Sequence, residues 1–433
     1  MRKKGFLLLF VSIIAVLFLS HPSYASQNKD VNIKHYHVDA TTYKRLNFTS
    51  IPNSETEIYY YRKSDGRKVS VKTVYSDDKG NINNVKINIP DDVNRIYFNH
   101  ILRDKTGSAI VDENGKTVSM VSSKGINGNT IDSNELRIFG SMTKANKFYS
   151  YVRCWDIYND MLQDMKDATS FTAKELKAKQ GKTVEPFEEK KVIIKYKEND
   201  KSKGLAGTYN NDFGDINKGD FVLQLFLPMY DNPTDQNKMD ERMKVYVAHE
   251  YAHYTMFQAI AREGMTSHGY KTHSSYNKYP QVSYKEGWGL FHANRYPYRL
   301  NMNGNLDVVV QGKDKDILYG KSTNRTVYSV FRDIYDLDNR IEKRDDMYNI
   351  ARDNFGRDYS TEQIEQLSNG LMFFAMRDSK ATTLEEYIKY LKENYVHDTH
   401  EFNNLLTNSF IHPLHYRGSI QLEQGSLVFS ERH

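Results

Sequence analysis

The sequence is poor in cysteine, and Cys154 is the only one in its 433 residues. No disulfide bond can form within the chain, so stability must come from packing and from any metal that the protein binds. The thiol could be a ligand that keeps a precursor inactive, but its neighbours Val152 and Trp155 favour a buried, unreactive side chain.

Proline and glycine are also scarce, with 9 and 24 residues. This composition excludes collagen-like and low-complexity chains, and a hydrophobic content of 39% is typical of a soluble globular protein. The sequence lacks the series of long apolar runs that a protein with several membrane spans needs. Its length is sufficient for two or three packed units.

The one long apolar run lies near the N-terminus, between Gly5 and Leu19, and follows basic residues at positions 2–4. Small residues around Ser23–Ala25 then fit a cleavage site, so we expect residues 1–25 to be a secretory signal peptide. An uncleaved anchor is the alternative, but the run is shorter than the ~20 residues of a membrane span. We therefore expect a protein that is secreted or loosely associated with the cell surface, with no stable membrane insertion after signal cleavage.

Removal of residues 1–25 takes away three positive charges and no negative ones, which lowers the formal net charge from +5 to +2. Basic and acidic residues are interspersed along the rest of the chain. Because a nucleic-acid-binding surface needs clustered basic residues, the sequence predicts no nucleic-acid partner.

The pattern of the chain changes near residue 130. Residues 26–130 contain short β-branched or alternating runs separated by turn dipeptides such as Asp65-Gly66, which predicts a β-sandwich-like module. Beyond it, helical spacing of apolar residues predominates, first over 142–168 and again from 235 to about 404. The Lys/Glu-rich stretch 173–191 is expected to be a solvated helix or linker. The strands expected from these patterns are 57–62, 68–75, 85–89, 95–102, 192–196 and 221–227.

A helix is predicted between a start signal at Pro233–Asp235 and a stop signal at Gly264. Its apolar face includes His249 and His253, which are four residues apart and therefore stack on adjacent turns. Two imidazoles in this arrangement can bind one metal ion, so we predict that both are zinc ligands. The other members of the face are Val245, Ala248, Ala252, Met256 and Ile260.

Glu250 lies about 100° round the helix from His249, beside the expected metal. Zinc lowers the pKa of a bound water towards ~7, and a neighbouring carboxylate can take the proton as the water attacks a carbonyl carbon. We therefore expect Glu250 to be the general base. The alternative is a pair of ordinary core histidines, but burial of two basic groups and a carboxylate without partners would be costly.

Catalytic zinc normally has three protein ligands, so the sequence must supply a third. In one known arrangement a third histidine follows six residues after the second, but Met256 and Ala259 occupy the positions that this pattern needs. The other common arrangement takes a glutamate from a following helix. Glu286 satisfies this arrangement, with a surface carboxylate near a helix start as the alternative.

Two glycines follow this candidate ligand closely, at Gly287 and Gly289. Each costs about 1 kcal/mol in a helix interior, so their presence suggests that a large element packs closely against the helix. The helix with the two histidines is the obvious candidate.

The segment His249–His253, followed by Glu286-Gly287, resembles the gluzincin group of zinc metallopeptidases. The Glu-Gly-x-small pattern and Tyr251 are closer to the bacterial collagenase-like branch than to the thermolysin branch. The resemblance covers roughly residues 190–340 and implies His249, His253 and Glu286 as metal ligands and Glu250 as the catalytic base. Two features differ from thermolysin: no Asn-Ala-aromatic motif is present, and a longer segment separates His253 from Glu286.

We therefore expect an α+β fold with three parts after the signal peptide. These are a β-rich module at 26–130, a zincin-like subdomain with a small mixed sheet and the active-site helix at 131–297, and a mainly helical subdomain at 298–433. Tyr319 and Tyr328 follow the helix of Glu286 and are candidate donors to the oxyanion, with Tyr328 preferred. Phe221–Leu227 is either an edge strand that pairs with a peptide substrate or an ordinary core strand.

The predicted function is that of a secreted, Zn²⁺-dependent metallopeptidase that hydrolyses proteins or peptides. The module at 26–130 could bind substrate, attach to a surface or act as a removable pro-segment. The alternative is a non-catalytic surface-binding protein with a structural or vestigial zinc site, in which Glu250 is dispensable.

Overall fold

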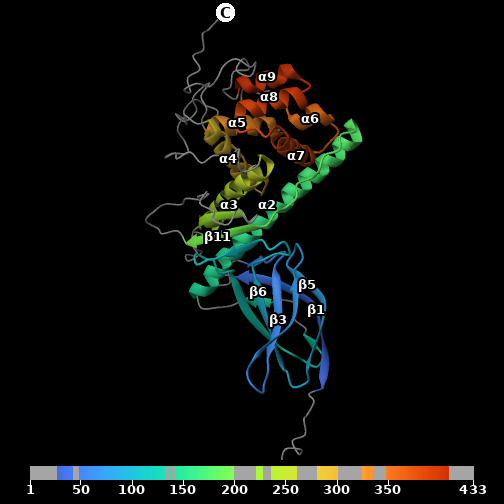
Figure 1. Cartoon of the computed structure of the whole chain (residues 1–433), viewed down its shortest axis with the longest axis vertical. Coiled ribbons are helices and arrows are strands. Elements are labelled where there is room, and N and C mark those ends of the chain that lie inside the picture. Colours follow the sequence, from blue (N-terminus) through green and yellow to red (C-terminus); the bar gives the residue numbers. More distant parts are fainter. Residues whose placement is uncertain are drawn as a thin grey trace, which may run out of the picture.

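The structure is a computed structural model that describes residues 27–41, 48–131, 136–138, 142–198, 221–227, 236–260, 280–300, 324–335 and 348–408. The expected signal peptide lies outside the described residues. Strands fill the first part of the chain and helices most of the rest (Figure 1), which confirms the mixed α and β composition. In the described ranges, no helix combines the length and the apolar character needed to cross a membrane.

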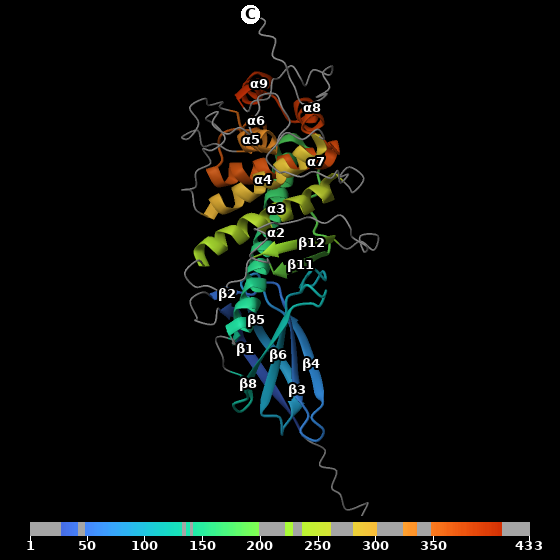
Figure 2. The ribbon, with the colours of Figure 1, turned by 90° about the vertical axis from the view of Figure 1, so that its left-hand side faces the viewer.

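The N-terminal β module, residues 27–131, consists mainly of two sheets that pack face to face (Figure 2). In the first sheet, β1 (Asn28–Thr41) pairs with β2 (Phe48–Ser50), β5 (Asn81–Pro90), β9 (Thr130–Ile131) and β10 (Leu136–Ile138). The second has the order β4 (Lys68–Tyr75), β3 (Glu55–Tyr61), β6 (Arg95–Ile101) and β8 (Ser119–Gly125). Tyr36 of β1 stacks on Phe98 of β6 with ring centroids 4.9 Å apart, which joins the two sheets through their inner faces.

A third sheet lies between the β module and the helices. It has the order β12 (Phe221–Leu227), β11 (Val192–Glu198) and β7 (Ala109–Val111). The sequence predicts a mixed sheet here, but both β7 and β12 are parallel to β11, because long connections rather than tight turns join these strands. β7 comes from the same stretch of chain as the β module, so the two parts share a sheet.

Helix α2 (Met142–Gln180) runs from the β module into the helical part of the molecule (Figure 1). Near its start, the indole of Trp155 donates a 2.7 Å hydrogen bond to the carbonyl of Pro52. Near its end, Thr172 approaches Gly370 so closely that a Cβ there would lie 2.2 Å from its hydroxyl oxygen. The helix continues through the first part of the Lys/Glu-rich stretch to Gln180, and residues 181–191 then have no regular secondary structure, with Phe187 buried.

The remaining helices pack around α2 and one another (Figure 2). Two of them begin with capping boxes: the hydroxyls of Ser360 and Thr383 accept from the backbone amide of the third helical residue, and their own backbone amides donate to the side chain of that residue. The helices are α3 (Gln236–Ile260), α4 (Pro280–Leu300), α5 (Asn324–Tyr335), α6 (Ile350–Phe355), α7 (Thr361–Ser379), α8 (Leu384–Asn394) and α9 (Thr399–Asn408).

Candidate metal centre

Helix α3 carries three of the four predicted site residues, and its bounds agree closely with the predicted helix. The hydroxyl of Tyr254 donates to the carbonyl oxygen of Lys190 at 2.8 Å and accepts from its amide at 3.0 Å, which ties α3 to the segment before β11. Most of the predicted apolar face is buried, but Val245 is 38% exposed. Its assignment to that face is wrong, because the buried side of the first turns runs through Met243 and Val247 instead.

Helix α4 packs against α3 and carries Glu286. A Cβ at Gly289 would lie only 2.6 Å from Cε1 of His249, so the missing side chain makes room for this imidazole. A Cβ at Gly287 would instead lie 2.4 Å from Cγ1 of Val327, on α5. The prediction that the glycines pack against the helix with the two histidines is therefore confirmed for Gly289 and wrong for Gly287.

A second contact fixes α4 against α3 close to the site. The indole nitrogen of Trp288 donates a 3.3 Å hydrogen bond to the hydroxyl of Thr255. Further along α4, Arg295 forms a buried ion pair with Asp164 of α2. The helices that carry the candidate ligands are thus held by polar bonds as well as by apolar packing.

The side chains of His249, His253 and Glu286 converge. The two Nε2 atoms lie 3.1 Å apart, and Oε2 of Glu286 lies 3.2 Å from Nε2 of His249 and 3.6 Å from Nε2 of His253. In the described part of the chain, this is the one group of three or more His, Cys, Asp or Glu residues close enough to hold a metal ion. The structure therefore brings the three predicted ligands together.

These separations lie within about 0.2 Å of those that a four-coordinate metal requires. Bonds of about 2.0–2.2 Å in a tetrahedral arrangement place neighbouring ligand atoms roughly 3.3–3.6 Å apart. Two imidazole nitrogens that face each other at 3.1 Å also present lone pairs to each other unless a proton or a metal ion lies between them. The donor atoms, their spacing and their mutual orientation all fit a bound cation.

The centre is buried, but unevenly. The side chains of His253 and Glu286 are 2% and 3% exposed, whereas that of His249 is 16% exposed. Burial lowers the pKa of His253 to about 4, so this imidazole is neutral at pH 7 and can act as a ligand. Burial also acts to lower the pKa of His249, but the hydrogen bond to Glu286 and the charge of Glu250 outweigh it and raise that pKa.

Glu250 is 3% exposed and is not one of the three converging residues. It is close enough for its charge to raise the pKa of His249. This agrees with the predicted position beside the metal ligands. Its role as a general base stays a prediction.

The sequence-based prediction missed Lys285. Its Nζ lies 3.6 Å from Oε1 of Glu286, whereas the distances from Glu286 to the histidines given above are to Oε2. Its position next to the predicted ligand in the sequence was a signal for such a contact. The direction of its side chain, however, could not be known from the sequence.

Two other predicted residues are buried on helices. Cys154 is fully buried on α2, and burial raises the pKa of its thiol, so it is the unreactive cysteine that its neighbours indicated. Tyr328 is buried on α5, next to the valine that contacts Gly287. Its assignment as the oxyanion donor stays a prediction. Tyr319 lies outside the described residues.

Comparison with known proteins adds no family to this description. The chain matches no family model. A search of curated proteins likewise finds no match. The chemistry of the site must therefore be argued from its own residues.

Proposed function

We propose that this protein is a secreted, zinc-dependent metallopeptidase of the gluzincin type. The observation that carries the proposal is the convergence of His249, His253 and Glu286, which come from two helices and approach one another within 3.1–3.6 Å. Two imidazoles and one carboxylate are a common ligand set of catalytic zinc, and the set leaves a fourth position for water. The proposed secretion rests on the signal-peptide pattern of residues 1–25.

In this proposal His249, His253 and Glu286 hold the metal, and Glu250 handles protons. Bound zinc would supply a water of lowered pKa and polarise the substrate carbonyl. The carboxylate of Glu250 accepts the proton of the attacking water and later passes it to the leaving amine nitrogen. The burial of Glu250 favours this role, because a partly desolvated carboxylate is a stronger base.

The sheet next to α3 offers a place for an extended substrate. Among the described strands, β12 pairs with β11 alone and forms one edge of the sheet, and α3 contacts it. An edge strand can bind a peptide through backbone hydrogen bonds, which suits a substrate recognised in extended form. We infer that β12 is this docking strand and that the sheet with α3 forms a zincin-like unit.

The test combines metal content with cleavage of casein or gelatin. Wild-type protein should contain one zinc ion per chain and cleave the substrate, and Glu250→Gln should retain the zinc and lose the cleavage. Zinc at full occupancy without any cleavage by the wild type would instead support the non-catalytic surface-binding protein. Glu286→Ala provides the check on the third ligand, because it should lower zinc affinity as well as activity.

A further inference from the structure

The two oxygens of Glu286 face different partners. Oε2 is directed at the imidazole pair, 3.2 Å from His249, whereas Oε1 lies 3.6 Å from the ammonium of Lys285. Consecutive residues of a helix project about 100° apart, so Lys285 must bend towards the carboxylate to make this approach. The carboxylate is therefore held from both sides.

This ion pair is shielded from water. The side chains of Lys285 and Glu286 are 14% and 3% exposed, whereas the pair of Lys68 and Glu57 on the β module is 43% and 19% exposed. Exposed pairs contribute about 0–1 kcal/mol, because water and side-chain entropy oppose them. A shielded pair interacts through a lower dielectric, so the ammonium restrains the carboxylate more strongly.

We propose that Lys285 is a positioning residue that restricts Glu286 to metal binding through Oε2 alone. This inference rests on the proposed function. Carboxylates bind metal ions through one oxygen or through both. Binding through both would make the metal with its water five-coordinate before substrate binds, and so fill the position into which a catalytic zinc expands during the reaction. By holding Oε1, Lys285 keeps that position open.

Repulsion between the Lys285 ammonium and a bound metal ion cannot explain why a lysine occupies this position. An ammonium close to the centre opposes the binding of a cation, so a lysine that did nothing else would only weaken the site. The restraint that Lys285 places on Oε1 of Glu286 offsets this weakening of metal binding. The same reasoning predicts that arginine, a longer cation with several donors, can replace Lys285.

The experiment uses cobalt(II), whose visible absorption bands are strong in four-coordinate sites and weak in five-coordinate ones. Cobalt is added to the metal-free full chain. Wild-type protein and Lys285→Arg should show strong bands. Lys285→Met should bind cobalt but show bands several times weaker, because Glu286 then binds through both oxygens. Peptidase kcat should fall in the same variant, because the metal is then already five-coordinate with its water and has no position left for the substrate carbonyl.

Lys244→Met is the matched control. This lysine lies on α3, has an 18% exposed side chain and pairs with Asp240 at 3.0 Å, so its loss removes a similar charge without touching Glu286. Its cobalt bands should equal those of the wild type. Circular dichroism of each metal-free variant verifies folding, and Lys285→Ala replaces Lys285→Met should the latter not fold.

The possible outcomes separate the two proposals. Strong bands in metal-loaded Lys285→Met would refute the role of Lys285 and leave the metal centre intact. A wild-type chain that takes up neither cobalt nor zinc would contradict the metal centre itself. Weak bands in both Lys285→Met and Lys244→Met would show a general charge effect and also overturn the positioning role.

Discussion

His100 in the β module and His253 in the helical part are 0% and 1% exposed, yet their surroundings differ. Burial lowers the pKa of both imidazoles, to about 3 for His100 and about 4 for His253. Nδ1 of His100 lies 3.0 Å from the hydroxyl of Thr56, and its Nε2 lies 3.1 Å from the hydroxyl of Ser122. Nε2 of His253 instead faces a second imidazole and a carboxylate.

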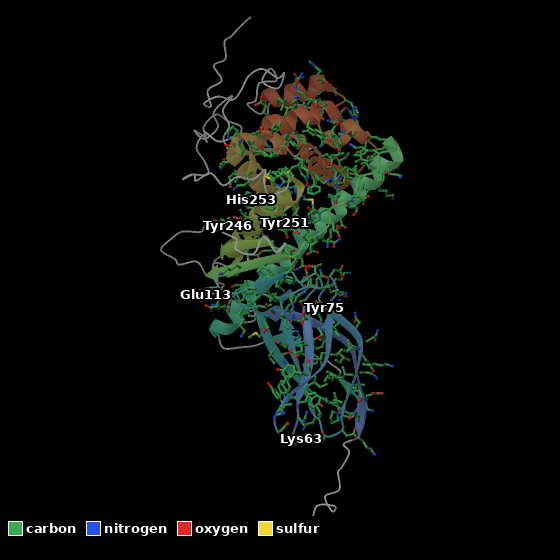
Figure 3. All side chains as sticks on the ribbon, viewed as in Figure 1. Lys63, Tyr75, Glu113, Tyr246, Tyr251 and His253 are labelled. Atoms are coloured by element: carbon green, nitrogen blue, oxygen red, sulfur yellow. The ribbon has the colours of Figure 1, made fainter. Side chains whose placement is uncertain are left out.

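The contrast shows which neighbours distinguish a structural histidine from a candidate ligand. A hydroxyl can donate or accept, so two hydroxyls satisfy either tautomer of a neutral ring and need no ion. A second imidazole and a carboxylate bring three potential ligand atoms to the same point in space, where one metal ion could bind all of them. Figure 3 shows how far apart the two parts lie, with His253 among the helices and Lys63 at the far tip of the β module.

The largest effect should come from Glu250→Gln, which removes the proposed base. We expect kcat/KM to fall about 10²- to 10⁴-fold, as is typical for loss of general base catalysis, with zinc content unchanged. His100→Gln is the control from the β module, and it should leave kcat/KM per folded molecule unchanged. Steady-state kinetics on a peptide substrate, with zinc measured in the same samples, decides both. Loss of zinc in Glu250→Gln would contradict its position outside the ligand set.

Gly289→Ala should weaken metal binding without removing any ligand. The added Cβ would lie 2.6–2.9 Å from three ring atoms of His249 and must displace the imidazole. We expect zinc affinity to fall about 10- to 100-fold, the range seen when the support of a ligand is lost. The control is Gly125→Ala in the β module, where the nearest atom is an ordinary contact at 3.9 Å. Competition with a chromophoric chelator measures the affinity, and equal affinities for both variants would contradict the prediction.

Acid should destabilise the β module through His100. Its folded pKa of about 3 lies below the ordinary value of 6.5, so below pH 6.5 the unfolded chain takes up a proton that the folded chain excludes. The free energy of unfolding therefore falls as pH falls from 6.5 towards 3, by about 1.4 kcal/mol per pH unit. Urea unfolding at pH 7 and pH 5 should show about 2 kcal/mol of this loss in wild type and correspondingly less pH dependence in His100→Gln. Parallel pH profiles of the two proteins would rule this contribution out.

The smallest effect should come from Lys68→Met. This lysine donates a 2.7 Å hydrogen bond to Glu57, but both side chains are open to water. We expect the free energy of unfolding to change by less than about 1 kcal/mol and the cobalt spectrum not to change at all. Thermal melts and cobalt titration provide the measurements. A weakening of the cobalt bands as large as that expected for Lys285→Met would remove the distinction between exposed and shielded pairs.

Local patterns predicted the elements of the fold well where a single stretch of chain determines them. The strand Lys68–Tyr75 has the predicted bounds, and the described part of the helix around His249, Gln236–Ile260, lies within the predicted range. The convergence of Glu286 with the two histidines was also predictable, because the helical spacing fixes the histidine pair and Gly289, three residues after the glutamate, marks a close approach.

The errors concern contacts between distant segments. The sequence gives no local signal that β7 pairs with β11 about eighty residues later, that Gly287 faces α5, or that Val245 is exposed. Each of these three features depends on which distant element packs against the residue in the folded protein. The direction of the Lys285 side chain belongs to the same class, since it is set by the carboxylate beside it and by the packing of α4.

The sheet that β7 shares with β11 and β12 limits where proteolysis can cut the chain without exposing a strand edge. Proteolytic trimming that released residues before 131 would also remove β7 from its place beside β11. The exposed edge of β11 would then present unpaired backbone groups, a feature that promotes aggregation. If the β module acts as a pro-segment, maturation must therefore leave it attached after cleavage, as a nicked but still associated partner.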